Sequence, residues 1–201
     1  AIWDELVRLP GLWESFGTST DPSSHAGRAD VDAPLEAKEG FINYYLDLPQ
    51  TQNTNSPKVA HLKVDYLGGI RYELVEMQLV DEEGDDHHYL RMRASGTEPI
   101  NRIYIESSRL STGQAMMKEV LRRLELITMD VLAQAHSPWH LVDMLCQTSM
   151  TPDTLTLVKK LIVDKAWDLA DILQKILQMT QTLEKRNRKV ICAWHEALQK
   201  Q

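Results

Sequence analysis

The sequence predicts an α+β fold in which a small four-stranded antiparallel sheet with flanking helices is followed by an all-helical extension. Between residues 59 and 107, apolar and polar residues alternate in four short stretches, which is the pattern of half-buried strands. Residues 32–47 and the region after Ser111 instead repeat apolar residues at helical spacing. No glycine follows Gly113 and no proline follows Pro152, so little in the C-terminal third would interrupt a helix. A helix, a run of strands and a second helix form a layered α+β arrangement.

The expected elements follow one another closely in the first half of the chain. Pro49 and the polar residues after it end the first helix. Gly68-Gly69 predicts a tight turn, the acidic run Asp81–Asp86 predicts a solvated turn, and the alternation slips near Val75, where we expect a β-bulge. The four strands are expected at 59–66, 72–80, 88–94 and 102–107.

We expect three segments: 1–31, 32–135 and 136–201. Residues 1–31 combine a short amphipathic stretch with a Ser/Thr/Pro/Asp-rich run, so they are interpreted as a linker or the end of a preceding domain. The sequence begins on Ala1 without methionine, and we therefore expect a fragment or a processed product. Residues 32–135 contain the predicted sheet, and residues 136–201 form the helical extension.

The helical extension contains two start signals and one long apolar seam. Ser137-Pro138 and Thr151-Pro152 each place a capping hydroxyl before a proline at the first helical position. From Leu155 to Val190 the seam is interrupted only by Lys165 and Arg186. One continuous helix over 152–200 would be about 70 Å long. The helix therefore either breaks near the polar run 184–189, which we favour, or forms a coiled coil with another chain. Trp139, Trp167 and Trp194 are expected to anchor the helical core.

The overall composition restricts the function classes. The 201 residues carry 22 basic and 29 acidic side chains, a net charge of −7, which disfavours nonspecific nucleic-acid binding. No apolar run approaches the ~20 residues that span a bilayer, so no membrane partner is expected. The two cysteines form no disulfide framework, which is typical of a reducing, cytoplasmic compartment.

The connection between the last two expected strands carries an unusual set of side chains. It contains Ser95, Gly96 and Thr97, with Arg93 before them and Arg102 after them. Hydroxyls donate hydrogen bonds, glycine lets consecutive backbone N–H groups converge, and the guanidinium is a planar fork that suits phosphate oxygens. This collection predicts an anion site. The alternative is an ordinary hairpin loop whose hydroxyls bond to their own backbone, with surface arginines nearby.

The stretch Arg93-Ala94-Ser95-Gly96-Thr97-Glu98-Pro99, followed by Arg102, closely resembles the phosphate-binding loop of the α-D-phosphohexomutases. This family includes phosphoglucomutase, phosphomannomutase and phosphoglucosamine mutase. The resemblance covers roughly residues 32–135 and implies the family's fourth domain, a TATA-binding-protein-like layer of sheet and helices. It implies that Arg93, Ser95, Gly96 and Thr97 contact the substrate phosphate, with Arg102 as a further contact.

The resemblance also implies an activity for the longer protein. Such an enzyme is an isomerase that moves a phosphoryl group between C1 and C6 of a glucose or mannose phosphate through a bisphosphate intermediate. The resemblance places the phosphoserine in the first domain and Mg²⁺ in the third, so this chain alone is expected to be inactive, with no catalytic residue and no metal or cofactor of its own. Its expected partners are the sugar phosphate and the missing upstream domains, and the helical tail also allows a homodimer. The alternative is a helical interaction or dimerisation module carried on a non-catalytic phosphosugar-binding domain.

Several other groups carry weaker signals. Ser24-His25 imitates the start of the family's catalytic loop but lacks the Asn-Pro that follows there, and Asp81–Asp86 does not match its metal loop. His136 and His140 have ligand spacing but are separated by Pro138, and Cys192 with His195 lacks further ligands. We interpret none of these as a site. The basic run Lys185–Lys189 is interpreted as a solvated helix face or helix break, with an acidic partner as the alternative.

Overall fold

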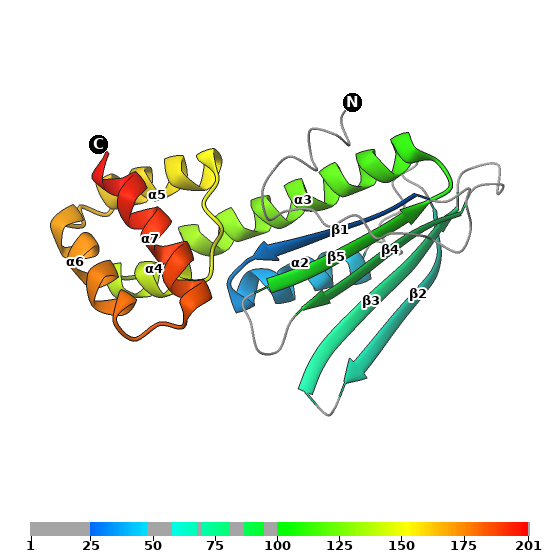
Figure 1. The fold of residues 1–201 in the computed structure, drawn as a ribbon, viewed down its shortest axis with the longest axis horizontal. Coiled ribbons are helices and arrows are strands. Elements are labelled where there is room, and N and C mark those ends of the chain that lie inside the picture. Colours follow the sequence, from blue (N-terminus) through cyan, green and yellow to red (C-terminus); the bar gives the residue numbers. More distant parts are fainter. Residues whose placement is uncertain (1–24, 48–57, 68–69, 81–86, 95–99, 201) are drawn as a thin grey trace. The chain divides into compact units, whose positions relative to one another are not determined.

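A computed structural model of the chain describes residues 25–47, 58–67, 70–80, 87–94 and 100–200 (Figure 1). The chain divides into two compact units. We call Ala1–Val31 with Lys38–Leu124 the sheet unit, and Asp32–Ala37 with Glu125–Gln201 the helical unit. The α+β class predicted from the sequence is confirmed.

The described strands form one five-stranded sheet in the order β1-β5-β4-β3-β2 (Figure 1). The pairs β2–β3, β3–β4 and β4–β5 are antiparallel. The prediction of four strands was therefore wrong, because the end of the segment interpreted as a linker forms β1. Gly27, Ala29 and Val31 do alternate with charged residues in β1, but the buried positions Gly27 and Ala29 are small, so the apolar signal is weak. The strands are β1 His25–Asp32, β2 Lys58–Leu67, β3 Ile70–Val80, β4 His87–Ala94 and β5 Ile100–Ser107.

Two irregularities interrupt the pairing of β2 with β3, and one of them lies close to Val75. The β2–β3 register shifts between Val59 and His61, and again between Asp65 and Leu67. The first shift leaves one extra residue in β2, whereas the second leaves extra residues in β3, between Ile70 and Leu74. Val75 itself pairs with Val64, but the second shift lies directly beside it, so an irregularity near Val75 is present as expected. The expected turns at 68–69 and 81–86 lie outside the described residues.

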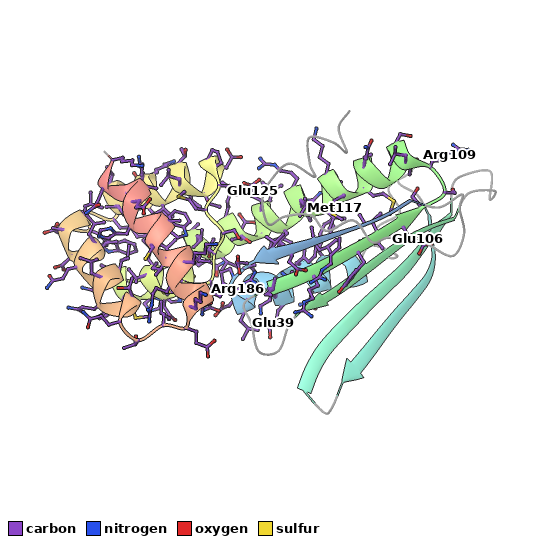
Figure 2. The ribbon with its side chains drawn as sticks, viewed as in Figure 1. Glu39, Glu106, Arg109, Met117, Glu125 and Arg186 are labelled. Carbon is purple, nitrogen blue, oxygen red and sulfur yellow. The ribbon has the colours of Figure 1, made fainter. Side chains whose placement is uncertain are left out.

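Two helices belong to this part of the chain. In the sequence, α2 (Leu35–Asp47) follows β1, and α3 (Leu110–Ala133) follows β5. Along β5, the buried Ile103 and Ile105 lie on either side of the half-buried Tyr104. Helix α3 approaches the buried side of β5 at Gly113, where an added Cβ would lie 3.2 Å from the Cβ of Ser107. A side chain at position 113 would therefore make an unusually tight contact with β5. Met117 (Figure 2) and Leu124 of α3 are buried, as is Phe41 of α2.

The helical unit contains the end of α3 and four further helices around one apolar core. These are α4 Pro138–Leu145, α5 Pro152–Asp164, α6 Leu169–Thr180 and α7 Lys185–Gln199. Its fully buried side chains come from every one of these helices and include Leu132, Leu141, Leu145, Val158, Ile172, Ile176, Ile191, Trp194 and Leu198. Residues far apart in the sequence thus share one core, which is what makes this region a unit.

Both predicted caps are present. Ser137 accepts a hydrogen bond from the backbone N–H of His140, and α4 begins at Pro138. Thr151 and Thr154 form a reciprocal capping box at the start of α5. The Thr151 hydroxyl also donates to Glu125 of α3 at 2.6 Å. Thr151 therefore both starts α5 and connects it to the preceding helix.

Replacing Thr151 with alanine should lower the free energy of unfolding by about 1–2 kcal/mol, because the first turn of α5 loses its cap. Thr156→Ala is the matched control, since its exposed hydroxyl bonds only to the carbonyl of Pro152 within the same helix. The control should change stability by about 0.5 kcal/mol or less. Urea unfolding followed by circular dichroism measures both. Equal effects of the two substitutions would contradict a special role for Thr151.

The long apolar seam is divided into three helices, not two. The favoured break near 184–189 is confirmed, and it lies at the start of the polar run, because α6 ends at Thr180 and α7 begins at Lys185. A further break, which the sequence analysis missed, separates α5 from α6. There Ala166 has a φ of 52°, a conformation that usually requires glycine, and Asp168 caps α6 by accepting from the N–H of Ala170.

The three tryptophans differ in burial. Trp194 is fully buried, as predicted, and Trp167 is partly buried against the helical core. The expectation for Trp139 was wrong, because it is 49% exposed. The ammonium of Lys175 lies 5.3 Å from its ring centre, so the ring packs against a neighbouring cation instead of the core.

Candidate anion site at the β4–β5 connection

The two arginines of the predicted site lie opposite each other across a strand pair. Arg93 in β4 is the register partner of Arg102 in β5, and Ala94 pairs with Asn101. The connection that links these positions contains Ser95, Gly96 and Thr97, which lie outside the described residues. The structure therefore places the backbones of Arg93 and Arg102 at the two ends of the connection. Directly opposed positions of an antiparallel pair share one face of the sheet.

The face of β5 that carries Arg102 is polar. Tyr104 and Glu106 (Figure 2) follow Arg102 on this face, and all three are half-buried. In the edge strand β1, the Arg28 guanidinium lies 5.7 Å from the ring centre of Tyr104. The other side of β5 carries the isoleucines, so the charged groups gather on the side away from the helix α3 contact.

Arg28 is held in place by a neighbouring carboxylate. Its Nε donates to one oxygen of Asp30 at 2.9 Å, and its Nη2 donates to the other at 2.5 Å. Such a two-pronged pair fixes the orientation of the guanidinium and neutralises its charge. The sequence analysis did not identify this pair, because its only signal is an Arg-x-Asp spacing inside a strand that was not predicted.

Asn101 is a second residue that the sequence analysis missed. It is 1% exposed, and its Nδ2 amide has no hydrogen-bond partner among the residues that the structure describes. A buried donor without a partner is costly, by about 1–3 kcal/mol. It precedes Arg102 in β5, so its side chain lies on the opposite face of the sheet, with Ile103 and Ile105. Nothing in the sequence distinguishes it from an ordinary strand asparagine.

The described part of this region contributes two opposed arginine positions to the candidate site. Arg102 supplies a permanent charge, and Arg93 lies at the opposed position. Within the described ranges, no group of three or more His, Cys, Asp or Glu side chains is arranged to hold a metal ion.

The other candidate groups belong to the helical unit or lie outside the described residues. His136 and His140 have ring centres 4.1 Å apart, and His140 belongs to α4, which begins between them at Pro138. Cys192 and His195 both lie on α7 and are half-buried. Ser24 and the acidic run 81–86 lie outside the described residues.

Cys146 is a buried thiol in the helical unit. Burial raises its pKa from 9.0 to about 12, and the nearby Asp143 carboxylate adds to the increase, while a backbone hydrogen bond opposes it. Because the pKa of the folded state is the higher one, the unfolded chain loses this proton first as the pH rises. The contribution of Cys146 to stability is therefore fully present below pH 9 and decreases as the pH approaches about 12.

We expect iodoacetamide to label Cys192 in the folded chain and to leave Cys146 unlabelled, since alkylation requires an accessible thiolate. Cys192 is half-buried, whereas Cys146 is 2% exposed. Mass spectrometry of the labelled peptides measures both sites, and both should react after unfolding in urea. Labelling of Cys146 as fast as Cys192 in the folded chain would contradict its burial.

No helix in the described part of the chain combines the length and apolar character needed to cross a membrane. Comparison with models of known protein families gave no match, and comparison with curated proteins gave none either.

Proposed function

We propose that this chain carries the substrate-phosphate-binding domain of a hexose-phosphate mutase. The single observation that carries the proposal is the stretch Arg93–Pro99 with Arg102, which matches the phosphate loop of the α-D-phosphohexomutases. The opposed register of Arg93 and Arg102 supports it, because the two guanidinium-bearing positions lie at the two ends of that loop. The finer fold that we propose is the TATA-binding-protein-like fourth domain of that family, with β1 as an additional edge strand.

In this proposal the chain positions the substrate and does not cleave bonds. The loop hydroxyls of Ser95 and Thr97 and the N–H groups around Gly96 donate to the phosphate that is not being transferred. The guanidinium of Arg93 adds a bidentate contact, and Arg102 approaches from the opposite strand. Anchoring one end of the sugar phosphate directs its free hydroxyl towards the phosphoserine that the upstream domain supplies. Mg²⁺ belongs to that upstream part of the enzyme.

The clamp has to accept either phosphate of the bisphosphate intermediate. A loop of backbone and hydroxyl donors suits this task, because it reads the phosphate and makes no demand on the sugar carbon that carries it. The glucose and mannose phosphates are therefore both suitable ligands. Each charge-assisted hydrogen bond contributes about 1.5–3 kcal/mol, and the cost of association removes much of the sum. We expect millimolar affinity, about 1–10 mM, for the isolated chain.

A titration of the isotope-labelled chain with glucose 1-phosphate tests this proposal, with the amide signals followed by NMR. Saturable shifts centred on Ser95–Thr97 are expected, and they should disappear in Arg93→Ala. Glucose without phosphate is the matched ligand control and should cause no shift in this loop. Absence of shifts at about 50 mM, well above the expected dissociation constant, would contradict a preformed clamp.

A second candidate is a helical interaction module carried on a non-catalytic phosphosugar-binding domain. The observation that favours it is the helical unit itself, which has its own core and follows the proposed clamp in the sequence. In this case the chain would bind glucose 1-phosphate and also self-associate through the helical tail. Analytical ultracentrifugation over a dilution series tests the second candidate. A strictly monomeric chain would exclude a dimerisation module.

A further inference from the structure

The first turns of α7 carry a concentrated positive charge. Four of the five residues in Lys185–Lys189 are basic, although the whole chain has a net charge of −7. Lys185, Arg186, Arg188 and Lys189 are all exposed. Arg186, at the start of α7 (Figure 2), belongs to the helical unit with its neighbours. The run thus forms a cationic surface on an otherwise acidic protein.

Only one of these cations is neutralised by a carboxylate in the described part of the chain. The Nε of Arg186 donates to Asp32 at 2.9 Å, and Asp32 also accepts from the hydroxyl of Ser149 at 3.1 Å. Arg188 donates to the backbone carbonyl of Leu183 at 3.0 Å, which leaves its charge in place. Within the described ranges, Lys185, Arg188 and Lys189 form no ion pair.

This placement is unfavourable for α7 itself. A helix N-terminus carries partial positive charge, so cations in the first turn reduce helix stability. The N-cap residue Glu184 makes no side-chain capping hydrogen bond that would offset the effect. The Arg186–Asp32 pair and the Arg188 hydrogen bond offset this cost only in part. A local cost that remains is typical of a residue set that serves an external partner.

The spacing of the three unneutralised cations indicates the kind of partner. Positions 185, 188 and 189 are related by three and four residues, so they share one face of the helix with neighbours about 5–6 Å apart. That spread exceeds a single phosphate group and suits several carboxylates along a peptide. A nucleic acid fits poorly, because three cations on one helix face offer few phosphate contacts.

We propose that Lys185, Arg188 and Lys189, which we call the α7 basic surface, bind an acidic peptide segment of a protein partner. The Asp and Glu carboxylates of the segment pair with the three cations, and their charge also complements the N-terminus of α7. This site is independent of the proposed phosphate clamp, which lies in the sheet unit.

Fluorescence anisotropy tests the proposal with the full chain and a labelled model peptide. A convenient probe has the sequence of Asp81–Asp86, in which five of the six residues are acidic. Binding is expected, and it should weaken between about 50 mM and about 500 mM NaCl as the Debye length shortens. A peptide in which Asn and Gln replace the acidic residues should not bind.

The decisive comparison uses two triple variants with the same change in net charge. Lys185→Gln with Arg188→Gln and Lys189→Gln should lower the affinity for the acidic peptide about tenfold. Lys118→Gln with Lys159→Gln and Lys160→Gln should leave it unchanged. Both variants should keep the helix content of the parent chain, since removing cations from a helix N-terminus is not destabilising.

Three results would overturn the proposal. The first is no binding by the parent chain, and the second is equal weakening in both triple variants, which would indicate a response to net charge alone. The third is displacement of the peptide by an equal concentration of inorganic phosphate, which would indicate a small-anion site.

Discussion

Replacing Trp194 with alanine is expected to lower the free energy of unfolding of the helical unit by about 3–5 kcal/mol. The side chain is fully buried in the core cluster, and its removal leaves a cavity that the surrounding helices can close only in part. Its indole Nε1 also donates to the backbone carbonyl of Thr148 at 2.8 Å. That buried acceptor would lose its partner, which adds to the cost.

The matched control is Trp139→Ala in the same unit. Trp139 is 49% exposed, and its main described contact is the cation of Lys175, so its loss should cost about 1 kcal/mol or less. A third variant, Trp194→Phe, keeps an aromatic ring but removes the hydrogen bond, and it should fall between the other two. Urea unfolding followed by circular dichroism measures all three, and similar midpoints for Trp194→Ala and Trp139→Ala would contradict the described packing.

This pair of tryptophans also shows which parts of the helical unit could be predicted from the sequence. The caps at Ser137 and Thr151 were predicted because a cap depends on neighbouring residues only. The burial of a tryptophan depends on which helices meet, and that information is not local. The break at Ala166 was missed for a related reason, since tertiary packing holds an alanine in a conformation that sequence rules reserve for glycine.

The sheet shows the same division between local and non-local information. The alternation of large apolar residues in β5 was visible, because Ile103 and Ile105 are large. The edge strand β1 was missed, because its alternation with charged residues rests on glycine, alanine and one valine, which give a weak apolar signal. The Arg28–Asp30 pair and the packing of Arg28 on Tyr104 could be recognised only from the structure, which places β1 beside β5.

The candidate site was found from a motif, and its wider surroundings were not. Arg93 and Arg102 are nine positions apart in the sequence, yet the hairpin register brings their backbones opposite each other. The resemblance named these residues, and the antiparallel pairing gives their placement a physical basis. Asn101 carried no sequence signal, since its burial depends on the layer beneath the sheet.

The largest effect on ligand binding is expected from the two opposed arginines of the proposed clamp. Arg93→Ala and Arg102→Ala should each weaken glucose 1-phosphate binding by at least about tenfold, because each removes at least one charge-assisted hydrogen bond to the phosphate. Arg93→Lys keeps the charge but loses the planar fork, so its affinity should lie between those of the parent chain and Arg93→Ala. NMR titration with glucose 1-phosphate measures the dissociation constants.

Lys118→Ala on α3 is the matched control, because it changes the net charge equally in the same unit and its side chain is exposed. It should bind glucose 1-phosphate as the parent chain does, and equal weakening would indicate a response to net charge alone. The double variant Arg93→Ala with Arg102→Ala then completes a double-mutant cycle. Two arginines that hold one phosphate from opposite strands share a ligand, so their effects should not add. Strictly additive effects would mean that the arginines act on different groups, and the clamp would then have to be assigned to only one of them.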